Sequence, residues 1–445
     1  MTNPLQSLAA SPTSRRSFMR GAAAAAGALV VGTYVAWPKG KALASSHASS
    51  AGGAPQPNAF IRIAPDNTVT VMIKHLDMGQ GNTTGLATVV ADELDADWSQ
   101  IRTEFAVANA DLYNNLAFGP VQGTGGSTAI ANSWMQLRRA AAAAKEMLVA
   151  AAVFEWKVPA SEIRVEKGVV RHSGTGRSAT FGELAASAAT LPVPQEPRLK
   201  DPKDWTYIGK HVPRVDSVAK TSGQTVYSLD IRRPGQLTAV VAHAPLFGAA
   251  VKSFDSAGAR AVPGVVDVVR IPTGVAVLAR DTWSAMRARE ALQVEWDDSA
   301  AEKRSSDAIM AEYKQIARRR GHVAANRGDV GRSITGAAKV LEAEFEFPYL
   351  AHASMEPLNG TIGRNPDGTI EVWAACQLQT VEQAVVASIM GVTPDKVKLN
   401  TLWAGGSFGR RATPSADYLA EAATILKAID GRAPVHLVWT REDDM

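Results

Sequence analysis

Cysteine is nearly absent from this sequence of 445 residues, because Cys376 is the only one. One thiol cannot form an internal disulfide, hold an iron–sulfur cluster or build a cysteine-rich zinc site. Any redox group must therefore be held by other means or by another chain. Excess charge is also scarce, with 47 basic against 43 acidic residues and part of the surplus in the first 41 positions. We therefore expect no nucleic-acid partner.

The remaining composition is that of an ordinary folded protein, with 46% hydrophobic and 20% charged residues. These values exclude a disordered chain and a collagen-like one. At about 150 residues per domain, the length predicts two to four domains. A membrane-spanning helix needs about 20 strongly apolar residues. The apolar run at residues 21–37 is shorter than that and consists largely of alanine and glycine.

The N-terminus has the pattern of an export signal. Arg15 and Arg16 precede the apolar run, and the small-residue site Ala42-Leu43-Ala44 follows it. This order is typical of a cleavable signal, and the paired arginines resemble a twin-arginine signal, which implies a periplasmic protein. We assign residues 1–44 to the signal and residues 45–58 to a Ser/Ala/Gly/Pro linker. An uncleaved N-terminal anchor remains the alternative.

Strands and helices alternate irregularly along the rest of the chain, which predicts an α+β fold. We divide it into a first unit (residues 59–215), a second (216–298), a charged connection (299–337) and a third (338–445). Periodicity and turn residues predict strands at 59–73, 101–107, 226–231, 237–242, 265–271, 275–279, 341–347, 370–375, 397–402 and 435–439. They predict helices at 83–94, 129–154, 253–261, 282–291, 381–390 and 415–429. The last unit ends on a strand and a charged turn, so we expect it to be incomplete.

Three glycine-rich turns each precede a predicted helix: the first glycine turn (residues 79–81), the second (123–128) and the third (405–409). Glycine allows positive φ angles and close approach of a ligand to the backbone, and amides ahead of a helix favour anions. The spacing fits neither a dinucleotide fingerprint nor a P-loop. Each turn alone is more often a plain connection, but three together favour a large phosphorylated cofactor.

Four stretches of the sequence resemble a known family. They are Met78-Gly-Gln-Gly-Asn-Thr-Thr84, a module at 227–298 with Ala261-Val-Pro-Gly-Val265, the stretch His352-Ala-Ser-Met-Glu-Pro-Leu-Asn359, and Cys376-Gln377 followed by Gly405-Gly-Ser-Phe-Gly409. Together they resemble the molybdopterin-binding large subunits of the xanthine dehydrogenase and aldehyde oxidase family, in particular its isoquinoline 1-oxidoreductase beta-subunit branch. The resemblance implies a multi-domain architecture in permuted order, with an α/β hammerhead domain at 216–298 and the start of the molybdenum domain at 338–445.

The resemblance also implies the cofactor and its site. The cofactor would be molybdopterin with molybdenum, as the cytosine dinucleotide. Gln377 would hydrogen-bond an oxo ligand, although a glutamine that only satisfies backbone groups is the alternative. Arg410 and Arg411 would reach phosphate or form a solvated pair, and no side chain of this sequence is assigned as a metal ligand. The residues that the resemblance assigns to the cofactor are Gly79, Gln80, Gly81, Gly126, Ser127, Thr128, Gln377, Phe408, Gly409 and Arg410.

The implied activity is hydroxylation of an N-heterocycle or oxidation of an aldehyde. Electrons would leave through 2Fe–2S clusters of a separate small subunit. A cytochrome c or a quinone would be the next acceptor. Association of the protein with the membrane through such a complex is left open. The family's catalytic glutamate is expected beyond the end of this sequence, so no catalytic residue is assigned here and we expect a fragment or a truncated product. The alternatives are a non-catalytic exported binding protein or an inactive fragment built on the same module.

Overall fold

The computed structural model describes residues 29–31 and 60–445. The predicted signal and linker lie outside these residues, except for Leu29–Val31. Within the described part of the chain, no helix is both long and apolar enough to cross a membrane. The fold is a mixed α+β arrangement, as the sequence predicts.

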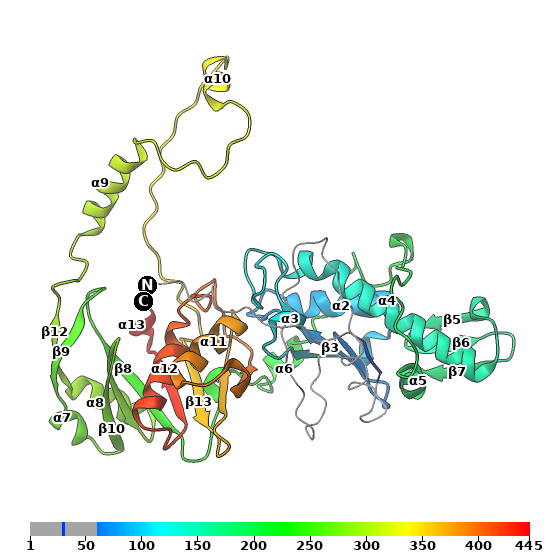
Figure 1. Cartoon of the computed structure of the whole chain (residues 1–445), viewed down its shortest axis with the longest axis horizontal. Helices are drawn as coiled ribbons and strands as arrows, with labels where there is room; N and C mark the ends of the chain where they lie inside the picture. The colour runs from blue at the N-terminus through cyan, green and yellow to red at the C-terminus, as the bar shows by residue number, and fades with distance from the viewer. Residues whose placement is uncertain (1–28, 32–59) are drawn as a thin grey trace.

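The first unit is built around a four-stranded sheet in the order β1-β2-β3-β4 (Figure 1). Its strands are Leu29–Val31, Ile61–Ile63, Val69–Ile73 and Ile101–Phe105. β3 and β4 are parallel, because α2 (Asn82–Leu94) carries the chain across between them. α2 packs against α4 (Ala129–Trp156), whose alanine-rich face lets the two helices approach closely. β2, β3, β4, α2 and α4 match the predicted elements, whereas β1 falls in the segment that we assigned to the signal.

A small three-stranded sheet extends the first unit. It consists of β5 (Ile163–Glu166), β6 (Val169–His172) and β7 (Arg177–Thr180), all antiparallel. α5 (Phe181–Ala188) follows and packs against α4. The first unit also contains the short helix α3 (Ala110–Tyr113) and 3₁₀ turns at Trp98–Gln100, Ala160–Glu162 and Pro202–Asp204. The short helix α6 (Ser217–Thr221) and the 3₁₀ turns Ser228–Asp230 and Pro394–Lys396 lie beyond it.

A seven-stranded sheet joins the second and third units. Its order is β10-β11-β8-β16-β13-β14-β15, with the bounds Val265–Ile271, Gly274–Ala279, Leu237–His243, Val435–Val438, Asn359–Arg364, Ile370–Ala374 and Val397–Thr401. β16 pairs parallel with β8, so the sheet continues across the boundary that we drew near residue 298. Outside it, β9 (Ala250–Asp255) pairs with β12 (Gln293–Asp297).

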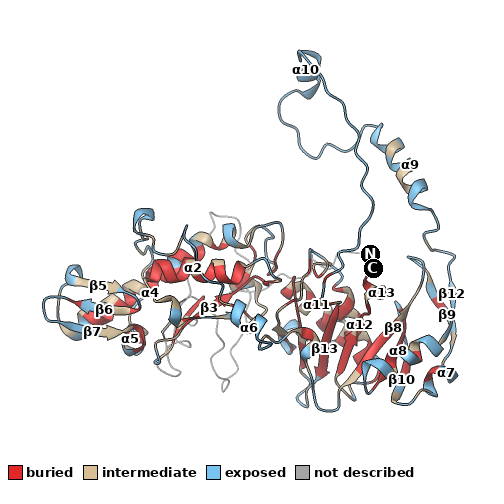
Figure 2. Ribbon diagram, turned by 180° about the vertical axis from the view of Figure 1, so that it is seen from behind, coloured by how far each residue is buried: buried red, intermediate tan, exposed pale blue. Residues whose placement is uncertain are grey.

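Helices cover both faces of this sheet around β8 and β11. α12 (Asp417–Ala428) packs on one face and α8 (Thr282–Ala291) on the other, so every residue of β11 is buried (Figure 2). α11 (Gln379–Met390) packs against α12. The short helices α7 (Ala257–Arg260) and α13 (Arg441–Asp444) complete this half.

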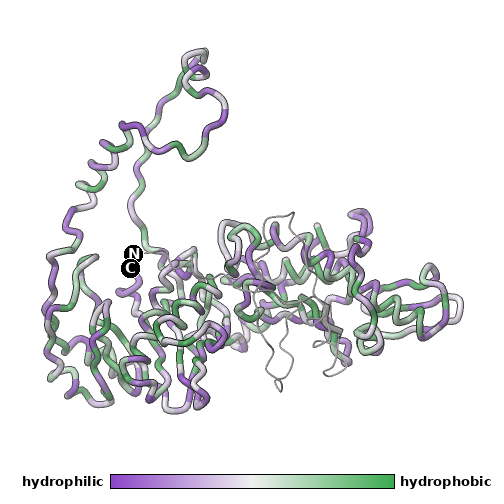
Figure 3. Tube along the Cα trace, in the orientation of Figure 1, coloured by the Kyte–Doolittle hydropathy of each residue, from purple (hydrophilic) through white to green (hydrophobic). Residues whose placement is uncertain are grey.

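Residues 298–353 form an arm that projects from the sheet and carries α9 (Ser306–Ala317) and α10 (Val330–Thr335) (Figures 1 and 3). The strand predicted at 341–347 is wrong, because these residues are irregular and exposed. Their alternation of apolar and acidic residues suits a strand, but no strand of the described chain pairs with them. The strand predicted at 226–231 also fails, since a 3₁₀ turn lies there. The helix predicted at 253–261 is confirmed only in its later part, because β9 continues to Asp255 and a short helix, α7, spans Ala257–Arg260.

Candidate functional site

Gln377 lies directly after β14 and connects two glycine turns. Its Nε2 donates to the Thr124 carbonyl at 2.7 Å, and the Thr124 N–H donates back to the Gln377 carbonyl at 2.9 Å. Ser407 Oγ donates to Gln377 Oε1 at 2.6 Å. The side chain is buried, with 3% exposed. Gln377 therefore ties the second glycine turn to the third, and one hydrogen of its amide remains for another acceptor.

The first glycine turn is organised by Asp77, a buried residue that sequence reasoning missed. Its carboxylate accepts from the N–H groups of Gly79 at 2.9 Å, Gly81 at 3.4 Å and Thr83 at 3.0 Å. The amides ahead of α2 therefore already have an anion, so this end of the helix is not free for a phosphate. A polar residue two positions before a Gly-x-Gly turn was the available signal.

Gln80 and Gly79 nevertheless remain accessible in this turn. Gln80 braces it by donating to the Leu76 carbonyl at 3.0 Å and accepting from the Met78 N–H at 2.7 Å. Gly79 has φ +112°, and no atom lies within 4 Å of the position that a Cβ would take. Arg214 donates to the Gly79 carbonyl at 3.0 Å. A ligand can therefore approach the outer side of the turn, beside a guanidinium that no local sequence pattern had indicated.

The second glycine turn offers an exposed backbone ahead of the long helix α4. Gly126 and Ser127 both have positive φ angles, +58° and +56°, and both are exposed. The Thr128 hydroxyl is used internally, donating to the Gly125 carbonyl at 2.8 Å. Gln122, just before the turn, is fully buried and its Nε2 has no partner in the described residues. The exposed backbone at Gly126 and Ser127 and the unpartnered amide of Gln122 suit an anionic or carbonyl-rich ligand.

The third glycine turn is strained. Gly406 and Gly409 have φ angles of +92° and +101°, and between them Phe408 has φ +57° although it is not a glycine. The Phe408 ring is 74% exposed. A strained, exposed aromatic residue in a fixed turn is typical of a position that contacts a ligand or a partner.

A buried ion pair fixes this turn from behind. Arg411 Nη2 donates to Glu356 Oε2 at 3.1 Å, its Nε donates to the Gly406 carbonyl at 3.2 Å, and Glu356 Oε2 accepts from the Gly405 N–H at 2.9 Å. Only 1% of Arg411 is exposed. Both predictions for Arg411 are therefore wrong, since it neither reaches an open phosphate site nor is solvated.

Arg410 has its donors engaged by acidic residues. Its Nη1 donates to Asp417 at 2.8 Å and its Nε to Asp444 at 3.0 Å. The guanidinium also stacks at 5.1 Å from the Trp439 ring centroid. This geometry favours a role in holding the turn to α12 and α13 over one in binding phosphate.

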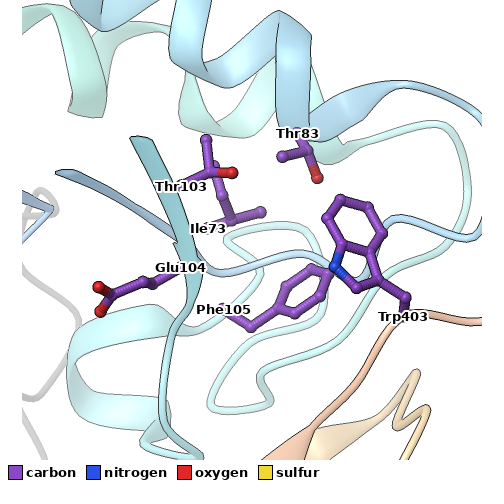
Figure 4. Close-up of a pocket in the computed structure, with 6 residues that line it drawn as sticks. All are labelled: Ile73, Thr83, Thr103, Glu104, Phe105 and Trp403. Atoms are coloured by element: carbon purple, nitrogen blue, oxygen red, sulfur yellow. The ribbon is translucent and has the colours of Figure 1, made fainter. Parts of the chain in front are cut away.

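The three glycine turns meet where the two halves of the molecule join. Leu76 and Met78, beside the first turn, pack in one small apolar cluster with Ala375 and Ala404, which precede Gln377 and the third turn. A pocket of about 30 Å³ lies nearby, lined by Ile73, Thr83, Thr103, Glu104, Phe105 and Trp403 (Figure 4). It is smaller than the roughly 300 Å³ of a typical ligand pocket, so it is no site for a pterin dinucleotide.

A buried histidine, His75, contacts the second glycine turn, and a buried lysine, Lys74, is its neighbour in the chain. His75 contacts the Gly123 carbonyl at 3.1 Å, and burial with the Lys74 charge lowers its pKa to about 4. Lys74 Nζ donates to the Asn114 carbonyl and to Gln136 Oε1 at 3.0 and 2.8 Å. Burial lowers the pKa of Lys74 to about 7. Both side chains are therefore largely uncharged above pH 7.

Known proteins share these sequence features. Two family models, each described as a molybdopterin cofactor-binding domain, match residues 14–229 and 314–445. The chain is 34% identical to isoquinoline 1-oxidoreductase subunit beta of Brevundimonas diminuta, over 87% of this chain and 55% of that protein. It is 30% identical to a membrane-bound aldehyde dehydrogenase (pyrroloquinoline-quinone) of Gluconacetobacter polyoxogenes, over 88% and 51%.

Among solved structures, quinoline 2-oxidoreductase from Pseudomonas putida 86 is 19% identical, with a TM-score of 0.44 over 53% of this chain and 35% of that chain. From the sequence matches, the chain belongs to the xanthine dehydrogenase family and carries molybdopterin cofactor-binding domains. The chain spans about half the length of the curated relatives it matches. In the described residues, no cluster of three His, Cys, Asp or Glu side chains could itself hold a metal ion.

The residues at the junction fit such a cofactor. The first and second turns expose positive-φ backbone that a side chain would obstruct, and Gln122 and Gln377 have amide hydrogens left for acceptors. A pterin carries ring nitrogens, carbonyl oxygens and a phosphate, which accept from such donors. Its metal would be held by sulfur atoms of the pterin and not by side chains of this chain, which agrees with a sequence that has a single cysteine.

Proposed function

We propose that this chain is the molybdopterin-binding part of a molybdenum hydroxylase that hydroxylates an N-heterocycle or oxidises an aldehyde. One observation carries the proposal: Gln377 joins the second and third glycine turns through hydrogen bonds to Thr124 and Ser407. A carboxamide fixed at both ends can present its remaining N–H in a constant direction. The isoquinoline and aldehyde names of the two relatives support the two substrate classes.

When bound, the cofactor supplies two-electron redox chemistry at molybdenum, and this chain binds and orients it. Gln377 would donate to a ligand of the metal without competing for the metal itself. The outer sides of the first and second glycine turns would hold the pterin and its phosphates, which we take to be those of the cytosine dinucleotide. Phe408 and Gly409 would border the substrate space, with the ring excluding water.

The proposal extends to partners, location and architecture. Since Cys376 is the only cysteine, the 2Fe–2S clusters would belong to a small partner subunit, which would pass electrons to a cytochrome c or a quinone. Residues 216–298 would be the hammerhead domain, placed between the two cofactor-binding segments in the permuted order. Arg15 and Arg16 support export to the periplasm by the twin-arginine route.

Metal content tests the proposal directly. The chain is expressed in a host that makes the molybdenum cofactor, and molybdenum and released pterin are measured per polypeptide. Gly81→Val should lower both severalfold, because Gly81 has φ +87° and the new side chain would also press on Arg214. Gly368→Val is the matched control, since Gly368 has φ +83° with open space in the β13–β14 hairpin, at the other end of these strands. A wild-type chain without molybdenum, or equal losses in both variants, would contradict the proposal.

A further inference from the structure

A cluster of three fully buried side chains lies behind the Gln377 loop. Cys376 precedes Gln377, Glu382 lies on α11 and Tyr418 on α12, and each is 0% exposed. The Cys376 thiol faces the Glu382 carboxyl group, and each influences the pKa of the other. The Tyr418 hydroxyl lies 3.4 Å from both Glu382 Oε1 and the Ala375 carbonyl. One carboxyl group therefore connects two helices to the residue beside Gln377.

Glu382 has no salt bridge within residues 60–445, although it is an acidic side chain in the core. Arg411 is the cation whose charge reaches it, but that guanidinium is bonded to Glu356 and to the Gly406 carbonyl. Cys376 and Tyr418 are the other titratable groups that face it, and burial raises the pKa of both. Burial also raises the pKa of Glu382 to about 8. The carboxyl group is therefore uncharged at neutral pH.

We propose that Glu382 is a positioning residue for Gln377, holding the Cys376–Gln377 peptide between α11, α12 and the two glycine turns. Adjacent residues in an extended segment point in opposite directions, so the Cys376 side chain is anchored in the core while that of Gln377 meets Thr124 and Ser407. An ionised Glu382 would require water, which the closed cluster does not admit. Ionisation therefore favours opening of the loop, which releases both contacts of Gln377. What Gln377 binds rests on the proposed function, but its positioning does not.

Cys376 provides a specific probe, because it is the only thiol of the chain. A thiol reagent can reach it only when the cluster opens, and only the thiolate reacts. The labelling rate of the wild-type chain is compared with that of Glu382→Gln at each pH, which cancels the titration of the thiol. The ratio of wild-type to variant rates should rise about tenfold per pH unit between pH 4.5 and 8 and be constant above pH 8. The ratio of wild-type to Glu382→Met rates should depend on pH in the same way, because this variant is also uncharged at position 382.

A second measurement separates positioning from simple packing. Hydrogen exchange of the peptide that contains Thr124 reports the contact with Gln377, because the Thr124 N–H donates to the Gln377 carbonyl at 2.9 Å. Its exchange in the wild type, relative to Glu382→Gln, should rise over the same pH range as the labelling ratio. The control is Glu371→Gln on β14, a partly exposed carboxylate that Lys398 and Asn400 hydrogen-bond; it should follow the wild type in both measurements.

Two results would overturn the proposal. A labelling ratio that does not change with pH would mean that Glu382 does not control the cluster. A ratio that rises while Thr124 exchange stays the same would mean that Glu382 packs the core without positioning Gln377. Neither measurement needs bound cofactor, so a failure here is distinct from an absence of molybdenum in the test of the proposed function.

Discussion

The two sides of the junction hold their glycine turns with opposite kinds of buried group. On one side a base, Lys74, is next to His75, which contacts the second turn at the Gly123 carbonyl, and on the other an acid, Glu382, lies behind the Gln377 loop. The pKa of Lys74 falls to about 7 and that of Glu382 rises to about 8. Both are therefore largely uncharged together only between about pH 7 and pH 8.

Neither group is placed there for stability. In the unfolded chain near pH 7.5, Lys74 and Glu382 would both be charged, so folding must remove a charge at each position. Natural sequences accept such costs mainly at functional sites. The junction therefore differs from the ordinary apolar core around it, because it contains buried ionisable groups that lose a charge when the chain folds.

The largest expected effect comes from the ion pair that holds the third turn. Arg411→Met leaves Glu356 buried without its cation, so the free energy of unfolding should fall by about 3–5 kcal/mol. Chemical denaturation at pH 7.5 measures this loss. The double variant Arg411→Met/Glu356→Gln, which removes both charges, should recover part of it. A loss below about 1 kcal/mol in the single variant would show that the pair is not needed.

The acid and base should give pH dependences of opposite sign. Below its folded pKa of about 7, Lys74 is charged in both states; between pH 7 and 10.5 only the unfolded chain keeps the proton. The free energy of unfolding should therefore rise with pH in that range, by up to about 1.4 kcal/mol per unit. Lys74→Met should lose this rise. An unchanged slope in denaturation experiments across that range would argue against a deprotonated Lys74.

For Glu382 the free energy of unfolding changes with pH in the opposite direction. Between pH 4.5 and 8 only the folded chain keeps the proton, so the free energy of unfolding should fall as pH rises, again by up to about 1.4 kcal/mol per unit. Glu382→Gln should remove the fall and leave the slope above pH 8 intact. A fall of the same size in Glu382→Gln would show that Glu382 is not the group that keeps a proton in the folded chain.

The smallest effect is expected on the arm, which serves as the reference for both sides. Phe347 is 76% exposed, so Phe347→Ser should change the free energy of unfolding by no more than about 0.5 kcal/mol. The same denaturation experiment measures it. A loss above about 2 kcal/mol would mean that this alternating segment packs against the chain in solution.

The sequence predicts the local elements well and their assembly poorly. β3 and α2 follow from patterns within 15 residues, because periodicity is a local property. The pairing of Val435 with Leu237 could not be predicted, since nothing in either strand specifies a partner so distant along the chain. The strand predicted at 341–347 failed for the same reason, because a correct pattern without a partner forms no sheet.

The candidate site shows the same difference between local features, which the sequence predicts, and contacts across the fold, which it does not. The positions of the glycine turns and of Gln377 were visible as motifs, and the structure brings them to one junction. The side chains that organise them were not: Asp77 satisfies the amides ahead of α2, and Arg411 is buried against Glu356. Which polar group a turn satisfies internally depends on contacts across the fold, and a motif records only the turn.

The position of β8 in the interior of the seven-stranded sheet has a consequence for synthesis. β8 lies between β11 and β16, and β11 leaves the ribosome soon after it. β16 is made roughly 200 residues after β8, which corresponds to roughly 10–40 s at ordinary rates of translation. During that interval one side of β8 has no partner strand and is open to wrong pairing with other chains. Residues 237–243 therefore keep one unpaired edge until residue 438 has emerged from the ribosome.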